Sequence, residues 1–129
     1  MGRAFCELLE RRGERYSAPP PDAPDFNDLE ALKRGIPEGT RIVLNCAAWT
    51  DVDGAEQKEA AATHVNGDAV GCVAERCKEL GALLVHYSTD YVFDGQASAP
   101  YGVDYPLAPL NAYGRSKAAG ERLLQGAGG

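Results

Sequence analysis

Hydrophobic residues near the start of the chain recur with the spacing of a helix. The helical set is Ala4, Phe5, Leu8 and Leu9, which predicts a first amphipathic helix. Residues 15–18 are a candidate short strand, and the proline-rich residues 18–24 predict a connecting loop, because proline can neither continue a helix nor pair inside a sheet. Residues 25–35 then predict a short helix with Asn27 or Asp28 as its N-cap.

Two later stretches are apolar enough to form strands that are buried on both faces. They are residues 41–47 (RIVLNCA) and 82–89 (ALLVHYST). The residues between them predict a long helix over about 58–80, with an apolar stripe along one face and Gly81 as its left-handed stop.

The last third of the chain predicts a long loop followed by a helix. Residues 90–110 are rich in Gly, Pro and Asp, and a structureless stretch of this length in a compact domain is usually functional. Asn111 is the expected cap of a final helix that runs to about residue 125. Because strands and helices alternate, we expect an α/β fold with a Rossmann-like parallel sheet and flanking helices.

Composition narrows the class of protein. A chain of 129 residues fits one domain, and its net charge of −6 argues against nucleic acid or an anionic membrane as a partner. The sequence lacks an apolar run of the roughly 20 residues that span a bilayer, and its first residues lack a secretory layout, so a cytoplasmic location is expected. The cysteines are expected to be reduced thiols rather than a disulfide framework; they are Cys6, Cys46, Cys72 and Cys77.

The main candidate for chemistry is a tyrosine and a lysine on the last predicted helix. Tyr113 and Lys117 are four residues apart, so their side chains share a helical face. A free tyrosine has a pKa of about 10, and a nearby ammonium group brings a phenol toward the range useful for acid–base catalysis. The same spacing is common in solvated pairs on surface helices, so the pair alone is weak evidence.

The ends of the two predicted strands strengthen this interpretation. Ser88, Thr89 and Asp90 lie at the carboxyl end of the second strand, where open α/β sheets bind ligands. A hydroxyl group there can bind a substrate carbonyl. The alternative is that Ser88 and Thr89 only cap the end of the strand. Residues 44–50 end the other strand with small side chains, which let a dinucleotide approach the backbone closely.

Four stretches of the sequence together resemble a known family. They are DFND (25–28), LNCAAWTDVDGAE (44–56), HYSTDYVFDG (86–95) and PLNAYGRSKAAGE (109–121). These stretches resemble the extended short-chain dehydrogenase/reductases, and within them the dTDP-4-dehydrorhamnose reductases. The resemblance implies an oxidoreductase of dTDP-rhamnose biosynthesis, which uses NADPH or NADH to reduce the C4 keto group of dTDP-4-dehydro-6-deoxy-L-mannose to dTDP-L-rhamnose.

The resemblance also implies a role for each matched residue. Tyr113 would be the proton donor to the keto oxygen, Lys117 would hold the nicotinamide ribose, and Thr89 would complete the catalytic set. Thr89 and Asp90 would bind the nucleotide-sugar substrate. The cofactor-binding residues would be Asp25, Phe26, Ala48, Trp49, Thr50, Tyr87, Tyr113 and Lys117.

Other polar residues are assigned no ligand. Asn66 resembles the family's structural asparagine, with a partly exposed polar helix residue as the alternative. A metal site is not expected, because His64 and His86 lack metal-ligand spacing and His86 fits a hydrogen-bonded strand histidine. An exposed acidic turn accounts for Asp51, Asp53 and Glu56.

The chain departs from the family pattern at both ends. The family begins with a strand and G-x-x-G-x-x-G, of which Gly2 matches the last glycine, and it continues past residue 129 into a substrate domain. Residues 1–129 are therefore expected to be a partial NAD(P)-binding Rossmann domain without the first strand and the C-terminal substrate domain. Residues 41–46 are expected to show an open sheet edge, and the chain alone is expected to be inactive. A homodimer is expected only of a longer parent.

Two alternatives remain open at this stage. Another nucleotide-sugar epimerase or reductase is the alternative enzyme. A non-catalytic binding subunit, similar to the regulatory subunit of methionine adenosyltransferase, is the alternative from a different class. Thr89 within STDYVF favours the reductase, since that subunit carries serine there. Neither NADH nor NADPH is favoured, because residues 15–25 hold no decisive acidic or basic pair.

Overall fold

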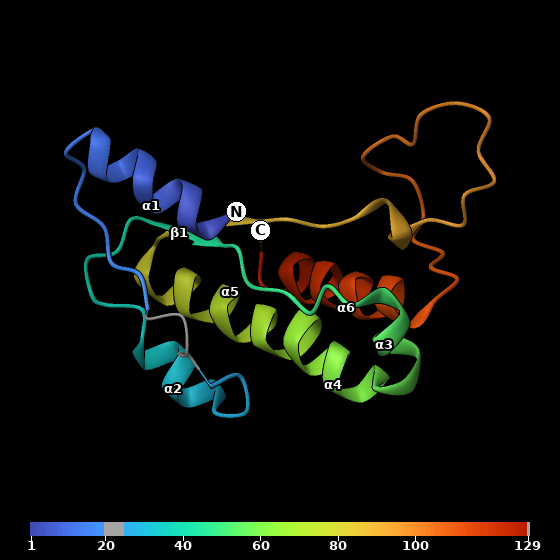
Figure 1. Ribbon diagram of the computed structural model, residues 1–129, viewed down its shortest axis with the longest axis horizontal. Helices are drawn as coiled ribbons and strands as arrows, with labels where there is room; N and C mark the ends of the chain where they lie inside the picture. The colour runs from blue at the N-terminus through green and yellow to red at the C-terminus, as the bar shows by residue number, and fades with distance from the viewer. Residues whose placement is uncertain (20–24, 129) are drawn as a thin grey trace.

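The computed structural model describes residues 1–19 and 25–128, and Figure 1 shows the arrangement of their helices and strands. In chain order the elements are α1 (Gly2–Arg11), α2 (Leu29–Arg34), β1 (Ile42–Asn45), α3 (Val52–Gln57), α4 (Glu59–Thr63), the π-helical turn η1 (His64–Asp68), α5 (Ala69–Leu80), β2 (Leu83–His86), the 3-10 turn η2 (Asp90–Val92) and α6 (Ala112–Gly126).

The two strands form a small parallel sheet, as the alternation of elements predicts. Residue Ile42 of β1 pairs with Leu83 of β2, and the register continues to the pair Asn45 and His86. Parallel neighbours require a crossover connection, and the run from α3 through α5 supplies it. Over residues 1–19 and 25–128, β2 is the strand that pairs with β1, so the other edge of β1 is open, as expected from the sequence.

Helices lie on both faces of this sheet, which gives the predicted α/β layers. In Figure 1, α1 lies on one side of β1, while α2, α5 and α6 lie on the other. Alternate residues of a strand point to opposite faces, and Val43 and Leu84 point toward α5. Gly2, at the start of α1, lies close to the Cys46 side chain just beyond β1.

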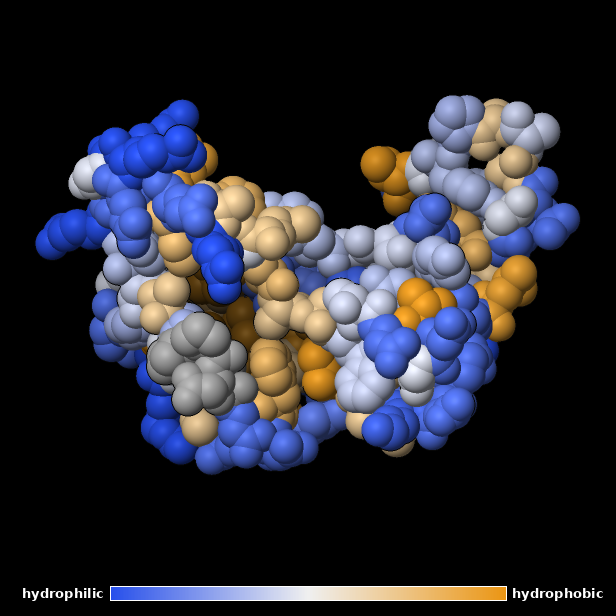
Figure 2. Space-filling model, viewed as in Figure 1, coloured by the Kyte–Doolittle hydropathy of each residue, from blue (hydrophilic) through white to orange (hydrophobic). Residues whose placement is uncertain are grey.

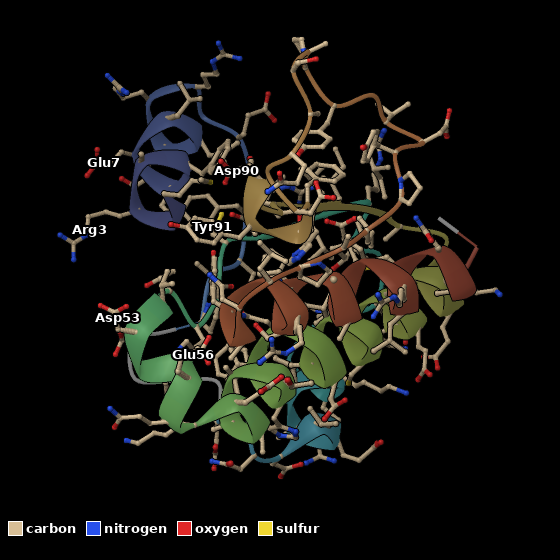
Figure 3. The ribbon with its side chains drawn as sticks, turned by 90° about the vertical axis from the view of Figure 1, so that its right-hand side faces the viewer. Arg3, Glu7, Asp53, Glu56, Asp90 and Tyr91 are labelled. Atoms are coloured by element: carbon tan, nitrogen blue, oxygen red, sulfur yellow. The ribbon has the colours of Figure 1, made fainter. Side chains whose placement is uncertain are left out.

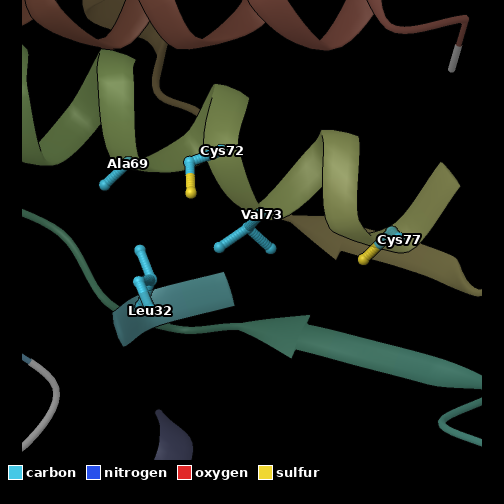
Figure 4. Packing of buried hydrophobic residues seen from close by; sticks show 5 residues of the cluster. All are labelled: Leu32, Ala69, Cys72, Val73 and Cys77. Carbon is cyan, nitrogen blue, oxygen red and sulfur yellow. The ribbon is translucent and has the colours of Figure 1, made fainter. Parts of the chain in front are cut away.

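The main core fills the space between α2, α5 and the sheet. Its buried members are Leu32, Ala69, Cys72, Val73 and Cys77, which Figure 4 shows in close view. Burial raises the pKa of the Cys72 and Cys77 thiols, so both remain protonated and act as small apolar groups. The four cysteines are free, as expected for reduced thiols, although Cys6 and Cys46 are only half-buried.

The candidate strand at residues 15–18 is wrong. Residues 14–19 have no regular secondary structure, and no described strand lies beside them to pair with. Tyr16 instead donates a hydrogen bond of 2.5 Å to the Glu10 carboxylate, which raises the pKa of Tyr16 to about 12. The predicted loop of residues 18–24 falls mostly outside the described residues, since 20–24 are not among them.

The single helix predicted over residues 58–80 is also corrected. Asp51 caps α3 by accepting a hydrogen bond from the Gly54 amide, so helical structure begins earlier than expected. Lys58, with φ −136°, separates α3 from α4, and η1 inserts a π turn before α5. Gly81, with φ 64°, ends α5 in the left-handed conformation, as predicted.

The segment before α6 is more structured than the predicted loop. Strand β2 ends at His86 instead of residue 89, and η2 begins four residues later, at Asp90. The loop beyond η2 is held by an aromatic cluster, in which Phe93 stacks on Tyr101 with ring centroids 4.2 Å apart and Tyr105 meets both rings edge-on. None of the helices within residues 1–19 and 25–128 has the length and apolarity needed to span a membrane.

Candidate active site

Three polar contacts fix the N-terminal turn of α6, which carries the predicted tyrosine. The Asn111 side chain accepts a hydrogen bond of 2.7 Å from the Gly114 amide, which confirms the predicted cap. The Glu56 carboxylate of α3 accepts a second bond of 2.7 Å from the Ala112 amide. The Arg115 guanidinium binds both carboxylate oxygens of Glu59, at 2.7 and 2.8 Å, so the turn is tied to α3 and α4.

The ring of Tyr113 contacts Tyr91 of η2 and a small buried cluster. It meets the Tyr91 ring edge-on, with centroids 5.8 Å apart and planes at 77°. It also packs with Trp49 against the buried alanines Ala55, Ala62 and Ala112. The Tyr113 hydroxyl makes no hydrogen bond to any residue that the structure describes, so the phenol is free to bind an exogenous oxygen.

Thr89 is the residue that caps η2. Its hydroxyl oxygen accepts a hydrogen bond of 3.3 Å from the Tyr91 amide, which caps η2, and it donates one of 3.2 Å to the Asp90 carboxylate. Figure 3 shows Asp90 and Tyr91 on this short turn. Tyr91 therefore connects Thr89 and Tyr113, the two residues predicted to meet the substrate oxygen.

Lys117 lies one helical turn beyond Tyr113 and reaches the end of β2. Its side chain is buried, with only 2% of the residue exposed. The ammonium donates a hydrogen bond of 2.5 Å to the Tyr87 carbonyl, and its Nζ lies 3.1 Å from His86 Nε2. Burial lowers the pKa of Lys117, while the Glu121 carboxylate raises it.

The sheet face beneath α6 changes from apolar to polar along the strands. Val43 and Leu84 are neighbours in register at the apolar end, and Asn45 and His86 are neighbours two residues later. Asn45 Nδ2 lies 3.1 Å from His86 Nδ1. Burial and the Lys117 charge lower the pKa of His86 to about 4, so the imidazole is neutral at pH 7. The predicted hydrogen-bonded strand histidine is confirmed.

The π turn holds the loop after β1. Asn66 is buried at 1% exposure, which favours the structural asparagine over a partly exposed helix residue. Its side chain accepts a hydrogen bond of 2.9 Å from the Trp49 amide, and it donates bonds to the Trp49 carbonyl and the Ser116 hydroxyl. Two residues earlier, His64 Nε2 lies 2.7 Å from the Phe26 carbonyl.

The predicted cofactor residues lie in two groups. Trp49, Tyr87, Tyr113 and Lys117 gather around α6 and the ends of the strands. Phe26 instead packs on the main core, next to Asp25, whose carboxylate is held by Asn27. Nothing in the sequence places these groups relative to each other; the π turn does so, because it binds the backbone of Phe26 and of Trp49.

The remaining predicted residues are placed as follows. Ala48 and Thr50 are exposed on either side of Trp49. Ser88 donates a hydrogen bond to the Glu121 carboxylate of α6, a contact beyond the simple capping that its position suggests. In the acidic turn, Asp53 and Glu56 project from α3 (Figure 3), and residues 1–19 and 25–128 contain no group of acidic, His or Cys residues that could hold a metal ion.

The surface above the strand ends is concave. Figure 2 shows it hollowed between one raised end formed by α1 and another formed by the loop after η2, with apolar side chains on the floor next to α1 and more polar ones toward the loop. In Figure 1 the segment from β2 to η2 runs between these two ends. The hollow therefore lies along the carboxyl side of the sheet, the usual position of ligands in open α/β folds.

Comparison with known proteins relates the chain to a family of reductases. A family model described as "RmlD substrate binding domain" matches residues 1–128. The chain is 42% identical over 125 residues to a dTDP-4-dehydrorhamnose reductase of Streptomyces griseus, covering 96% of this chain and 41% of that protein. It is 49% identical over 126 residues to a dTDP-4-keto-6-deoxy-D-glucose reductase of Streptomyces niveus, covering 96% of this chain and 43% of that protein.

A solved structure is similar over almost the whole chain. The crystal structure of dTDP-4-dehydrorhamnose reductase from Bacillus anthracis in complex with NADP superposes with a TM-score of 0.87 at 31% identity. The superposition covers 98% of this chain and 45% of that one, so the Rossmann-like α/β prediction is confirmed. The chain spans less than half the length of each of these proteins.

Proposed function

Because the chain belongs to the family described as "RmlD substrate binding domain", we propose that it carries the nicotinamide and catalytic residues of a dTDP-4-dehydrorhamnose reductase. The proposed reaction is the NAD(P)H-dependent reduction of the C4 keto group of dTDP-4-dehydro-6-deoxy-L-mannose to dTDP-L-rhamnose. Residues 1–129 would form part of the NAD(P)-binding domain. A cytoplasmic location, a homodimer and no nucleic-acid partner belong to the same proposal.

The single observation that carries this proposal is the polar arrangement at the end of β2. Tyr113 presents a free hydroxyl group, and Lys117 is buried one helical turn away. An ammonium has three hydrogens to donate, while Tyr87 O and His86 Nε2 are its two neighbours here. The third hydrogen remains for a hydroxyl group of a bound ribose, so the residues present fit a nicotinamide nucleotide.

The proposed chemistry uses these residues in separate roles. Bound nicotinamide supplies the hydride for the sugar C4 carbon. Tyr113 donates its phenolic proton to the sugar O4, so the carbonyl becomes an alcohol and the phenolate that remains is stabilised by the Lys117 charge. The Thr89 hydroxyl, at the start of η2, would bind the same oxygen, and Asp90 would face the sugar.

The cofactor is proposed to lie along the hollow. Trp49 and Tyr87 flank the α6 residues, with Ala48 and Thr50 exposed beside the indole. Asp25 and Phe26, held through the Phe26 carbonyl by His64, would meet the adenine end. The NADP complex of the similar B. anthracis enzyme favours NADPH, and NADH remains the alternative.

A second substrate is supported by one comparison. The S. niveus relative carries the name of a reductase of dTDP-4-keto-6-deoxy-D-glucose, at higher identity than the S. griseus relative. The two keto-sugars carry their keto group at the same carbon. Tyr113 and Lys117 would serve either reaction, because both sugars would be reduced at the same carbon. These two residues therefore do not distinguish the two sugars.

Cofactor binding can be tested on this chain directly, because Trp49 is its sole tryptophan. NADPH titrated into the chain should quench Trp49 fluorescence, since the indole packs beside Tyr113. Lys117→Met should weaken that binding at least about tenfold, the loss of one charge-assisted hydrogen bond. Lys78→Met, an exposed control on α5, should leave binding unchanged. Quenching equal in both variants would contradict the proposal.

Turnover can be tested in a chimaera in which residues 1–125 replace the matching stretch of the S. griseus relative. Oxidation of NADPH should follow addition of dTDP-4-dehydro-6-deoxy-L-mannose. Tyr113→Phe should lower kcat at least about 100-fold, the usual range for removing a general acid. Tyr16→Phe, a distant exposed control, should not. A Tyr113→Phe rate within tenfold of the parent would remove Tyr113 from the role of acid.

A further inference from the structure

His86 is the polar residue of the site that the proposed reaction leaves without a role. Its imidazole is half-buried between α6 and β1, and each ring nitrogen faces a nitrogen donor group. Nε2 lies 3.1 Å from Lys117 Nζ, and Nδ1 lies 3.1 Å from Asn45 Nδ2. A neutral imidazole has one donor and one acceptor nitrogen, so the two neighbours cannot both donate to it.

The state of Lys117 decides which nitrogen carries the hydrogen. The Tyr87 carbonyl accepts a hydrogen bond from Nζ, and the Glu121 carboxylate on α6 raises the pKa of Lys117, which favours the ammonium. An ammonium has no lone pair, so His86 Nε2 must be the acceptor. The hydrogen of the neutral ring is then on Nδ1. The Asn45 side chain accepts it after a half-turn of its amide, and Oδ1 then gives up the hydrogen bond of 3.2 Å that it accepts from the Ala47 amide.

We propose that His86 is a positioning residue for Lys117, which accepts a hydrogen bond from its ammonium and is itself oriented by Asn45. This inference rests on the proposed function, because the role of Lys117 toward the cofactor comes from there. Parallel pairing in register places Asn45 beside His86, and the helical turn from Tyr113 brings Lys117 above them. With Tyr87 O and His86 Nε2 each taking one ammonium hydrogen, the third remains for a hydroxyl group of the bound cofactor.

The arrangement persists over a defined pH range. The groups that face the His86–Lys117 pair are Asn45 on β1, the Tyr87 carbonyl after β2 and Glu121 on α6. With its pKa lowered to about 4, His86 is neutral at pH 7 and its Nε2 can accept. Protonation of the ring at lower pH would place two like charges side by side and release Lys117.

The first test is the tautomer of His86 in the unmodified chain. Nitrogen-15 NMR of the histidine-labelled chain at pH 7 should show the hydrogen of His86 on Nδ1 and a bare Nε2. The chain has one other histidine, His64, which serves as the internal reference. A hydrogen on His86 Nε2 would overturn the proposal, because Nε2 could not then accept from an ammonium. The measurement needs neither cofactor nor substrate.

The second test is the titration of Lys117 in two variants. With carbon-13 label on the lysine side chains, of which there are four, His86→Phe should lower the titration midpoint of Lys117 by about one pH unit. His86→Gln, which keeps an acceptor oxygen, should stay within a few tenths of a unit of the parent. An unchanged midpoint in His86→Phe would refute the positioning role, whereas failure of NADPH to bind would refute only the proposed function.

Discussion

The side chain of Asn66 binds both backbone polar groups of Trp49, with the amide 2.9 Å from Oδ1 and the carbonyl 3.0 Å from Nδ2. Its Nδ2 is also 2.9 Å from the Ser116 hydroxyl of α6. One buried residue on the π turn thus joins the loop after β1 to the helix that carries Tyr113. The distance between Trp49 and α6 is set by this contact.

Asn66→Ala should therefore destabilise the chain by about 2–4 kcal/mol, because it removes several buried hydrogen bonds and leaves their partners unpaired. Urea unfolding followed by Trp49 fluorescence measures the change. Asn27→Ala, at an exposed position, is the matched control and should change stability by less than about 0.5 kcal/mol. Equal effects of the two substitutions would show that Asn66 contributes no more than a surface amide.

Gly120 on α6 is expected to tolerate no side chain. A Cβ at this position would overlap the Asn66 carbonyl oxygen, a backbone atom that cannot move aside. Gly120→Ala should therefore cost about 2–3 kcal/mol despite the better helix propensity of alanine. Gly126→Ala on the same helix meets nothing within 4 Å and should stabilise by about 0.5–1 kcal/mol. Thermal unfolding of both variants tests the prediction, which a stabilised Gly120→Ala would contradict.

These contacts also mark the limit of what the sequence predicts. Periodicity and caps predict α1, α2, β1, β2 and α6, because amphipathic spacing and residues such as Asn111 act within a few positions. Spacing likewise predicts that Tyr113 and Lys117 share a face. By contrast, Asn66 meets Trp49 across 17 residues and Lys117 meets His86 across 31. The π turn and the partners of His86 follow from packing between elements, for which local pattern carries no signal.

The stability of the chain should fall as the pH drops from 7 to 5, in part because of His86. Its pKa is lowered in the folded state to about 4, below the value of 6.5 for a free imidazole, so the unfolded chain binds more protons between these values. The free energy of unfolding therefore decreases as the pH falls through this window. His86 accounts for about 1–2 kcal/mol of the decrease between pH 7 and 5.

The comparison that isolates this contribution is the parent chain against His86→Phe. Between pH 7 and pH 5, the free energy of unfolding should fall less in His86→Phe than in the parent, and the difference should be about 1–2 kcal/mol. His64→Gln is the control at the other histidine, and it should retain the His86 contribution. A loss of stability that is identical in the parent and in His86→Phe would show that the imidazole titrates alike in both states.

Removing the charge of Lys117 should weaken cofactor binding without destabilising the fold. A buried ammonium is costly, and the lowered pKa of Lys117 reflects that cost. Methionine matches its length without a charge, so Lys117→Met should unfold within about 1 kcal/mol of the parent or be more stable. The same variant should bind NADPH at least about tenfold more weakly. Calorimetry and Trp49 fluorescence on one preparation measure both quantities. If Lys117→Met instead lost about 3 kcal/mol of unfolding free energy, the ammonium and its two hydrogen bonds would stabilise the fold. Weaker NADPH binding by the variant could then no longer be assigned to a lost contact with the cofactor.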